Sequence, residues 1–400
     1  MNKNETNMGS DSNSSRIPKL RFPGFTGEWE EKKLGDILDY EQPTPYLVAS
    51  DLYQKQGTPV LTAGKTFILG YTDETVGVYD KVPVIIFDDF VTESKYVTFP
   101  FKAKSSAMKM LSLKNKTDNL YFTYVSMLLN QKPVGDHKRH WISETSQIQV
   151  LVPPTPAEQQ KIASFLSEID DQIASQGQKV DALKEKKKGL MQQLFPQAGE
   201  TTPKRRFPGF EGEWEEKNLE EFGQIITGST PSRQNKKYWG GEFCWISAQD
   251  MKVKYIYDTK EKVTNEGKKQ CRILPKNSVL VTCIASIGLN AITKVDCATN
   301  QQINAIITNN ETIAEFLYQS MENSIYKLKA MAGQTAVPII NKQQFSNFSI
   351  FVPQSSAEIG KIVGCLSTLD DTITAESDKL EVLKNHKKGL MQQLFPQPIK

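Results

Sequence analysis

Several short segments of the chain combine basic side chains with amides, hydroxyls and aromatic rings. The richest is residues 227–241, TGSTPSRQNKKYWGG, and residues 102–109 and 137–141 are smaller examples. Lysine and arginine neutralise phosphates, and arginine, asparagine and glutamine pair with base edges. The alternative for each segment is an ordinary solvated loop. The candidate nucleic-acid contacts are Lys102, Lys104, Ser105, Lys109, His137, Lys138, Arg139, Ser229, Thr230, Arg233, Lys236, Lys237, Tyr238, Asn300, Gln301 and Gln334.

Catalytic motifs, in contrast, are incomplete in this sequence. Residues 63–66, AGKT, end like a phosphate-binding loop, but Pro59 stands where that loop needs its first glycine. Asp88 and Asp89 with Lys95 faintly resemble a nuclease site, yet these acids lie too close along the chain to come from separate strands. The sequence also lacks the residue spacings that are typical of hydrolase catalytic triads and of glycine-rich dinucleotide-binding motifs. The sequence therefore predicts no catalytic residue, no metal site and no cofactor in this chain, which binds and positions something else.

The composition is that of a folded protein with nearly balanced charge. Of the 400 residues, 38% are hydrophobic, which is enough to build cores and excludes wholesale disorder. Lys and Arg number 49 against 46 Asp and Glu, so a histone-like polycation is excluded but a local basic surface is not. No apolar run is long enough to span a membrane. Polar residues 1–16 predict a disordered tail, and sparse cysteines favour a cytoplasmic location.

The chain contains a long internal repeat. RFPGFTGEWEEKKL begins at Arg21 and RFPGFEGEWEEKNL at Arg206, while KKGLMQQLFPQ begins at Lys187 and again at Lys387. The segments of 22 residues that begin at Val152 and Val352 are identical at 11 positions. The middle segments, residues 36–151 and 221–351, share no obvious similarity. Each half therefore has a shared front, a divergent middle and a shared rear.

Each rear segment predicts a long helix. TPAE at residues 155–158 and SSAE at residues 355–358 are typical of capping boxes, and Pro196 and Pro396 end the helices. Apolar residues recur at alternating steps of four and three, a period of 3.5 that predicts a left-handed coiled coil; the alternative is an amphipathic core helix. The predicted seam is Ile162, Leu166, Ile169, Ile173, Val180, Leu183, Leu190, Ile362, Leu366, Leu369, Ile373, Leu380, Leu383 and Leu390.

These elements predict an α+β protein with two mixed α/β globular domains, separated by two long helices that pair antiparallel in a pseudo-twofold arrangement. The predicted boundaries are a tail at 1–16, a first domain at 17–154, a first helix at 155–196, a linker at 197–205, a second domain at 206–354 and a second helix at 355–396. Unlike domains held by a repeated frame suit the reading of two unlike half-sites on DNA.

With these features the chain resembles the specificity (S) subunit of Type I restriction-modification systems. The resemblance rests on the doubled RFPGF-x-GEW-EEK fronts, the doubled helix starts and the doubled KKGLMQQLFPQ ends. The run from Gly228 to Met251 is similar to the opening of a target recognition domain, and the run from Gly333 to Pro353 is similar to its close. The first middle segment lacks the opening pattern.

The resemblance implies two target recognition domains that bind a bipartite asymmetric sequence in double-stranded DNA, with the helices setting the spacer. It implies two methyltransferase (M) subunits, which use S-adenosylmethionine to methylate adenine N6, and two restriction (R) subunits, which use ATP and Mg to cleave. The S chain itself is non-catalytic and binds no membrane. Two alternatives stay open at this point: a coiled-coil adaptor that binds only proteins, and a nuclease or methyltransferase that acts alone.

Overall fold

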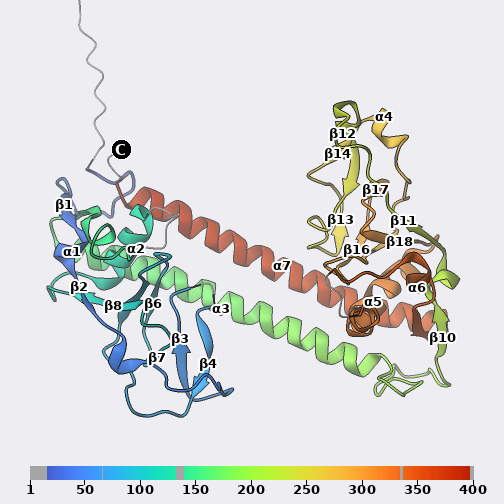
Figure 1. Ribbon diagram of the computed structural model, residues 1–400, viewed down its shortest axis with the longest axis horizontal. Coiled ribbons are helices and arrows are strands. Elements are labelled where there is room, and N and C mark those ends of the chain that lie inside the picture. The colour runs from blue at the N-terminus through green and yellow to red at the C-terminus, as the bar shows by residue number, and fades with distance from the viewer. Residues whose placement is uncertain (1–15, 65, 132–138, 334–336, 397–400) are drawn as a thin grey trace, which may run out of the picture. The chain divides into compact units, whose positions relative to one another are not determined.

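The computed structural model describes residues 16–64, 66–131, 139–333 and 337–396 (Figure 1). The chain forms two units: unit 1 comprises the chain up to Gly177 and from Asp378 onward, and unit 2 comprises residues 178–377. The long helices α3 (Pro156–Leu194) and α7 (Ser356–Leu394) are each shared between the units. The predicted mixed α/β class with two long helices is confirmed. Three candidate contacts and the predicted tail up to residue 15 lie outside the described residues: His137, Lys138 and Gln334.

Most of unit 1 is body 1, the divergent segment 36–151, with the strands of the repeat at its edge. Antiparallel β1 (Glu30–Lys33) and β9 (Gln149–Val152) form a small sheet. The larger sheets have the orders β2-β8-β5-β6 and β4-β3-β7. Their strands are β2 (Leu38–Glu41), β3 (Thr58–Leu61), β4 (Ile68–Thr72), β5 (Val84–Asp88), β6 (Ser94–Val97), β7 (Lys102–Ala103) and β8 (Met108–Leu113). The shorter helices of unit 1 are α1 (Leu34–Ile37), η1 (Thr44–Tyr46), α2 (Leu120–Asn130) and η2 (Thr145–Gln147).

Unit 2 repeats the small sheet but not the body. Antiparallel β10 (Glu215–Asn218) and β19 (Ser349–Val352) form its small sheet. Body 2, the divergent segment 221–351, has sheets of order β11-β18-β15-β16-β13 and β14-β12-β17. Their strands are β11 (Gln224–Thr227), β12 (Trp239–Ile246), β13 (Tyr255–Ile256), β14 (Lys262–Val263), β15 (Val279–Thr282), β16 (Asn290–Thr293), β17 (Cys297–Thr299) and β18 (Ile303–Ile307). The shorter helices of unit 2 are η3 (Leu219–Phe222), η4 (Lys236–Tyr238), α4 (Asn265–Lys268), α5 (Glu311–Met331) and α6 (Lys342–Ser346).

The two small sheets have the same register. Glu30 lies opposite Val152 in unit 1, and Glu215 lies opposite Val352 in unit 2. The front and rear repeats of each half therefore meet across a short sheet. Body 1 and body 2 are insertions between equivalent strands, which is how one frame holds two unlike bodies.

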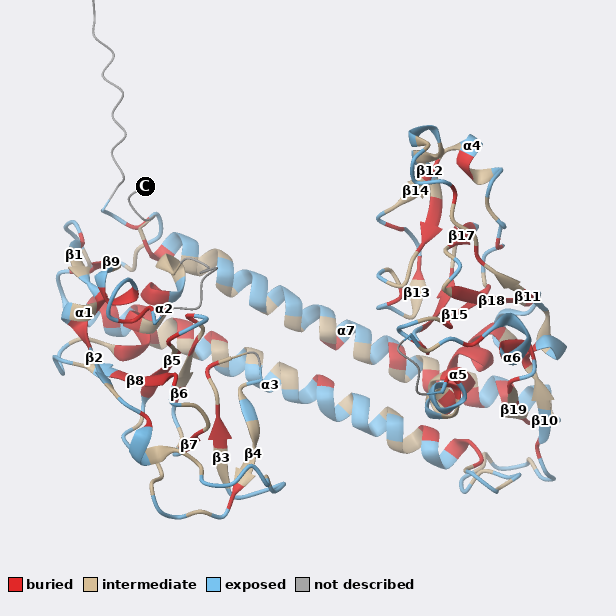
Figure 2. Cartoon of the chain, in the orientation of Figure 1, coloured by how far each residue is buried: buried red, intermediate tan, exposed pale blue. Residues whose placement is uncertain are grey.

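The long helices bury the predicted seam. Every seam residue is buried or partly buried, and most residues between them are exposed (Figure 2). In unit 2, Lys187 pairs with Asp370 and Lys179 pairs with Glu376, so rising numbers on α3 meet falling numbers on α7. In unit 1, Lys387 pairs with Asp170, while Leu394 shares a core with Ile162. Within each unit the two helix segments are therefore antiparallel.

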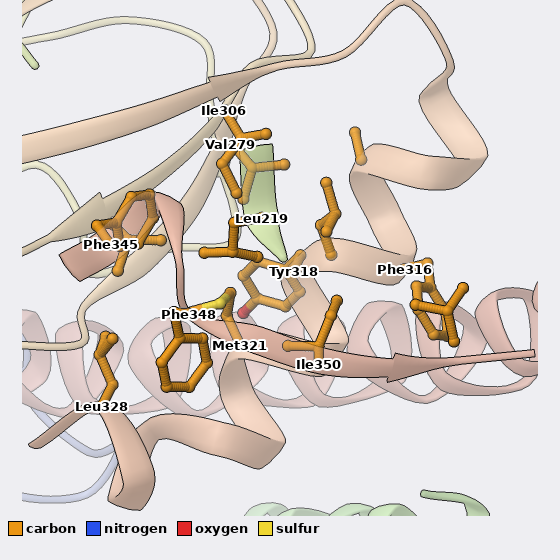
Figure 3. Packing of buried hydrophobic residues seen from close by; sticks show 14 of the residues in the cluster. Leu219, Val279, Ile306, Phe316, Tyr318, Met321, Leu328, Phe345, Phe348 and Ile350 are labelled. Atoms are coloured by element: carbon orange, nitrogen blue, oxygen red, sulfur yellow. The ribbon is translucent and has the colours of Figure 1, made fainter. Parts of the chain in front are cut away.

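The end of each helix packs against the front segment of the other copy. In unit 1 the Trp29 ring lies 5.9 Å from the ring of Phe395, which follows α7. In unit 2 the Trp214 ring lies 5.9 Å from the ring of Phe195, which follows α3. Phe195 belongs to the largest core of unit 2, which also includes side chains of α5, α7 and β19 (Figure 3). The occurrence of this tryptophan and this phenylalanine in both copies of the repeat thus has a packing cause.

A bidentate ion pair joins each front segment to the start of a long helix. The Arg21 guanidinium donates to both Glu158 oxygens, each at 2.8 Å, and Arg206 donates to both Glu358 oxygens, each at 2.7 Å. Both glutamates are only 1% exposed. The sequence pattern predicts that these glutamates are capping-box residues. The structure shows in addition that each glutamate pairs with an arginine. The first arginine of each RFPGF motif is therefore a structural clamp.

Candidate nucleic-acid interface

Two polar loops of body 2 lie against each other. The Gly228 N–H donates to the Ile303 carbonyl at 3.0 Å, and the Ser229 N–H donates to the Thr299 carbonyl at 2.8 Å. A β-carbon at Gly228 would come within 2.1 Å of a backbone oxygen of Asn300, so only glycine fits there. The loops after β11 and β17 therefore bring four candidates together: Ser229, Thr230, Asn300 and Gln301. The Thr230 hydroxyl donates to the side-chain amide oxygen of Gln301.

Arg233 is exposed, but its guanidinium is engaged by other side chains of body 2. Its guanidinium donates to the two carboxylate oxygens of Glu261 at 2.7 and 2.8 Å. It also lies over the rings of Trp239 and Trp245, 3.9 and 4.8 Å from their centroids. The hydrogen bonds raise the pKa of Arg233 and lower the pKa of Glu261. The ion pair and the stacking hold the Arg233 guanidinium in place, so a direct DNA contact of this exposed arginine stays a prediction.

The lysines that follow Arg233 are differently placed. Lys236 and Lys237 form the short helix η4 and are exposed. Neither pairs with a carboxylate among the residues that the structure describes. Tyr238 is half-buried, and its carbonyl accepts from the Thr264 N–H at 3.0 Å. This backbone bond fixes η4 beside α4, so the two lysines project from an anchored turn.

Sequence reasoning missed further basic residues beside η4. Lys269 and Arg272 are exposed after α4. The Arg272 backbone N–H donates to the Ser229 hydroxyl at 3.0 Å, and its guanidinium donates to the Thr227 carbonyl at 2.8 Å. The run GKKQCR at residues 267–272 was the available signal. The bond between α4 and η4, and those of Arg272 to the loop after β11, place these residues near η4, and we call the set the η4 face: Lys236, Lys237, Lys269 and Arg272.

Two lysines of body 1 are buried, against expectation. The Lys102 ammonium lies 2.6 Å from Glu74 and donates to the Val76 carbonyl at 2.8 Å. The Lys109 ammonium lies 3.1 Å from Asp89. Only 4% of Lys102 and 3% of Lys109 is exposed. Both are corrected to internal ion pairs, because a lysine enclosed beside its own carboxylate is unable to reach a phosphate.

The remaining candidates of body 1 give a sparse surface. Lys104 is half-buried and pairs with Asp51. The Ser105 hydroxyl accepts from the Ala107 N–H at 3.1 Å, as in a turn. Arg139 is exposed and borders the undescribed residues 132–138. Of these three candidates, only Arg139 is exposed.

Comparisons with known proteins agree with this architecture. The family model described as Type I restriction modification DNA specificity domain matches residues 26–185 and 211–385. The EcoR124I/EcoR124II specificity subunit of Escherichia coli is 36% identical over 383 residues, covering 91% of this chain and 92% of that protein. This chain belongs to the type I specificity-subunit family. The putative MjaX specificity subunit of Methanocaldococcus jannaschii is 24% identical over 403 residues, covering 92% of this chain and 93% of that protein.

A solved structure supports the fold of this specificity subunit. The crystal structure of the S subunit from M. genitalium matches with a TM-score of 0.66 at 16% identity, covering 96% of this chain and 100% of that one. The two matched ranges each contain one body and much of one long helix, so the specificity subunit has two specificity domains. In these systems the specificity subunit is the component that recognises DNA.

The described residues of the specificity subunit form neither a membrane-spanning helix nor a metal-binding cluster. Within the described ranges, no helix has the length and apolar character needed to cross a membrane. In the same ranges, no three side chains of His, Cys, Asp or Glu gather where a metal ion would bind. Asp89, one of the nuclease-like acids, instead accepts the Trp141 N–H at 2.8 Å and pairs with Lys109. Its role in the structure is to hold body 1 together.

Proposed function

We propose that this specificity subunit reads a bipartite, asymmetric DNA target, with one half-site for each body. The observation that carries the proposal is the insertion of two unlike bodies between equivalent strands of a repeated frame. The chain itself makes and breaks no bond. Methyltransferase subunits with S-adenosylmethionine supply adenine N6 methylation, and restriction subunits with ATP and Mg supply cleavage.

We assign the spacer between the half-sites to the long helices. The chain passes from one unit to the other at two points, after Gly177 in α3 and after Ser377 in α7. Both points lie inside the helices, so helix length is the element of the chain that can define a number of unread base pairs. A helix adds about 1.5 Å per residue.

Within body 2 we assign phosphate contacts to the η4 face and base contacts to the exposed amides beside it. Lys236 and Lys237 are exposed cations on an anchored turn, which is the placement that phosphate binding needs. Gln234 and Gln301 are exposed nearby and carry the amide groups that read adenine edges. Arg233 positions this loop through Glu261 and the two tryptophans.

Replacing Lys236 and Lys237 with glutamine is expected to reduce the salt dependence of DNA binding. Each lost phosphate contact lowers the slope of log K against log salt by about 0.9, so the double variant loses about 1.8. The measurement is binding of the assembled complex to a duplex that contains its methylation target, mapped for the wild type by sequencing. Titrations at four or more salt concentrations give the slope.

Two matched variants make this result specific. Lys342→Gln removes an exposed lysine from α6 and is expected to leave the slope unchanged. Arg233→Met is expected to weaken binding with little change in slope, because its charge is already paired with Glu261. Equal slopes for the wild type and the double variant would remove the η4 face from the interface. Complete absence of DNA binding by the wild-type complex would favour the protein-only adaptor.

We propose two equivalent docking sites for methyltransferase subunits at the ends of the long helices. Lys184, Lys188 and Gln192 are exposed on α3, and the repeat places the same residues on α7 as Lys384, Lys388 and Gln392, again exposed. Buried identities are explained by the shared frame. Identical exposed residues in both copies are instead the pattern that one kind of partner, bound twice, would require.

Charge reversal at one helix end is expected to release one partner. Lys184→Glu with Lys188→Glu, or Lys384→Glu with Lys388→Glu, should each convert a complex with two methyltransferase subunits into one with a single subunit, because like charges then meet at the contact. Native mass spectrometry of the reconstituted complex counts the subunits. Two bound subunits in both variants would place the docking sites elsewhere. Reversal of the exposed Lys342 is the control.

A further inference from the structure

A polar pair interrupts the apolar seam at the same place in each unit. In unit 2, Lys187 of α3 pairs with Asp370 of α7. In unit 1, Lys387 of α7 pairs with Asp170 of α3. The four residues occupy equivalent positions of the two repeats, each 200 residues from its counterpart. Both lysine side chains are less than one-fifth exposed, so these pairs belong to the helix interface.

The two bodies approach this pair with different chemistry. In body 2, Lys254 reaches Asp370 with its ammonium 2.9 Å from Oδ2, and the Gln319 amide donates to the same oxygen at 2.6 Å. In body 1, the Tyr121 hydroxyl donates to Asp170 and accepts from the Lys387 ammonium at 3.2 Å. Each aspartate–lysine pair of the frame therefore receives hydrogen-bond donors from the body of its own unit.

Lys254 is the contact that joins two carboxylates, Asp370 and Glu315. Its side chain is 8% exposed, and its ammonium lies 2.8 Å from Glu315 of α5 and 3.0 Å from the Ser367 hydroxyl of α7. Burial alone would lower the pKa of Lys254, but Asp370 and Glu315 raise it above the ordinary value. The ammonium is therefore charged at neutral pH and is held between one helix of the body and one helix of the frame.

The two carboxylates that contact Lys254 also have other cations nearby. Asp370 keeps Lys187 as a partner, and Glu315 also lies 3.9 Å from Lys294. The carboxylates would thus retain cations if Lys254 lost its charge. A buried ion pair of this kind adds little net stability compared with apolar packing, and in some proteins such pairs instead fix one conformation. The arrangement around Lys254 fits a role in orientation, because both carboxylates keep other cations.

We propose that the aspartate–lysine pairs are sockets that seat each body on the helices, and that Lys254 is the positioning residue for body 2. The inference rests on the proposed function, since the seating matters only if body 2 reads a half-site at a set distance. Tyr121 has the same role for body 1. The two bodies thus use unlike side chains, a lysine and a tyrosine, to satisfy identical frame residues.

The test measures spacer preference in the assembled complex with its methyltransferase subunits. Duplexes carry both mapped half-sites separated by the natural spacer or by one base pair more or fewer, and methylation rates are compared. Lys254→Met retains the length and packing of the side chain and removes its charge. We expect the ratio of the natural spacer to its neighbours to fall at least threefold, because body 2 is no longer held in one orientation. Lys254→Arg should restore much of the ratio.

The possible outcomes distinguish a role of Lys254 in orienting body 2 from a purely structural role, and both from a failure of the proposed function. A merely structural role would lower methylation in proportion on all three spacers and leave the ratio unchanged, which would overturn the socket. Tyr121→Phe removes only a hydroxyl and supplies a second test if Lys254→Met folds poorly; its ratio should also fall. A wild-type complex that methylates all spacers equally would refute the proposed function itself.

Discussion

Replacing Arg206 with alanine is expected to lower the free energy of unfolding of unit 2 by about 3 kcal/mol. The change leaves the Glu358 carboxylate, which is 1% exposed, without the guanidinium that donates to both its oxygens. Removing one partner of a buried ion pair costs about 3–5 kcal/mol, and the lower end applies because the Arg206 side chain is 18% exposed. Chemical denaturation followed by circular dichroism gives the difference.

The adjacent arginine provides a matched control. Arg205 is exposed, and it is its backbone N–H that donates to the Gln193 carbonyl, so Arg205→Ala should change stability by less than about 0.5 kcal/mol. Replacing both members of the pair, Arg206→Met with Glu358→Met, should recover part of the loss, because no unpaired charge remains buried. Equal losses for Arg205→Ala and Arg206→Ala would contradict the clamp.

The seam of the long helices was predictable because its signal is local. Steps of three and four residues place Val180 and Leu380 on one face of a helix whatever the rest of the chain does. All predicted seam residues are buried or partly buried in the structure. The polar residues Lys187 and Lys387 fall on the same face, but their partners Asp370 and Asp170 lie on the other helix. Periodicity gives the face of a helix and not the residue it meets.

The candidate site was harder to predict for a related reason. Lys102 and Lys109 have the composition of a basic loop, yet Glu74 and Asp89, which neutralise them, are distant in sequence and are brought close by the sheets of body 1. Arg233 was predicted only as a DNA contact, because its partners Glu261, just before β14, and Trp245, in β12, are distant in the sequence. Lysine and arginine look alike in a sequence whether they face solvent or an internal carboxylate, so only tertiary contacts separate Lys236 from Lys102.

Replacing Trp214 with alanine is expected to cost about 3–5 kcal/mol and to loosen the end of α3. Trp214 is 3% exposed and packs on Phe195 and on Phe316, whose ring lies 6.3 Å away, so the change opens a cavity where the front segment, the helix end and body 2 meet. Hydrogen exchange should rise around residues 190–196 and 214–219. The equivalent replacement of Trp29 should act in the same way around Phe395.

Phenylalanine at the same position separates packing from hydrogen bonding. The Trp214 indole N–H is buried and has no acceptor within the described part of the chain. Trp214→Phe therefore loses ring area but also removes an unsatisfied donor, and we expect it to cost well under half of the alanine change. If phenylalanine were as costly as alanine, the indole N–H would have to be bonded in solution, and the contact would depend on that bond rather than on the filled volume. If both changes were nearly neutral, the helix end would not be held by this tryptophan, and the packing of Phe195 on Phe316 and the backbone bond of Arg205 would have to hold it.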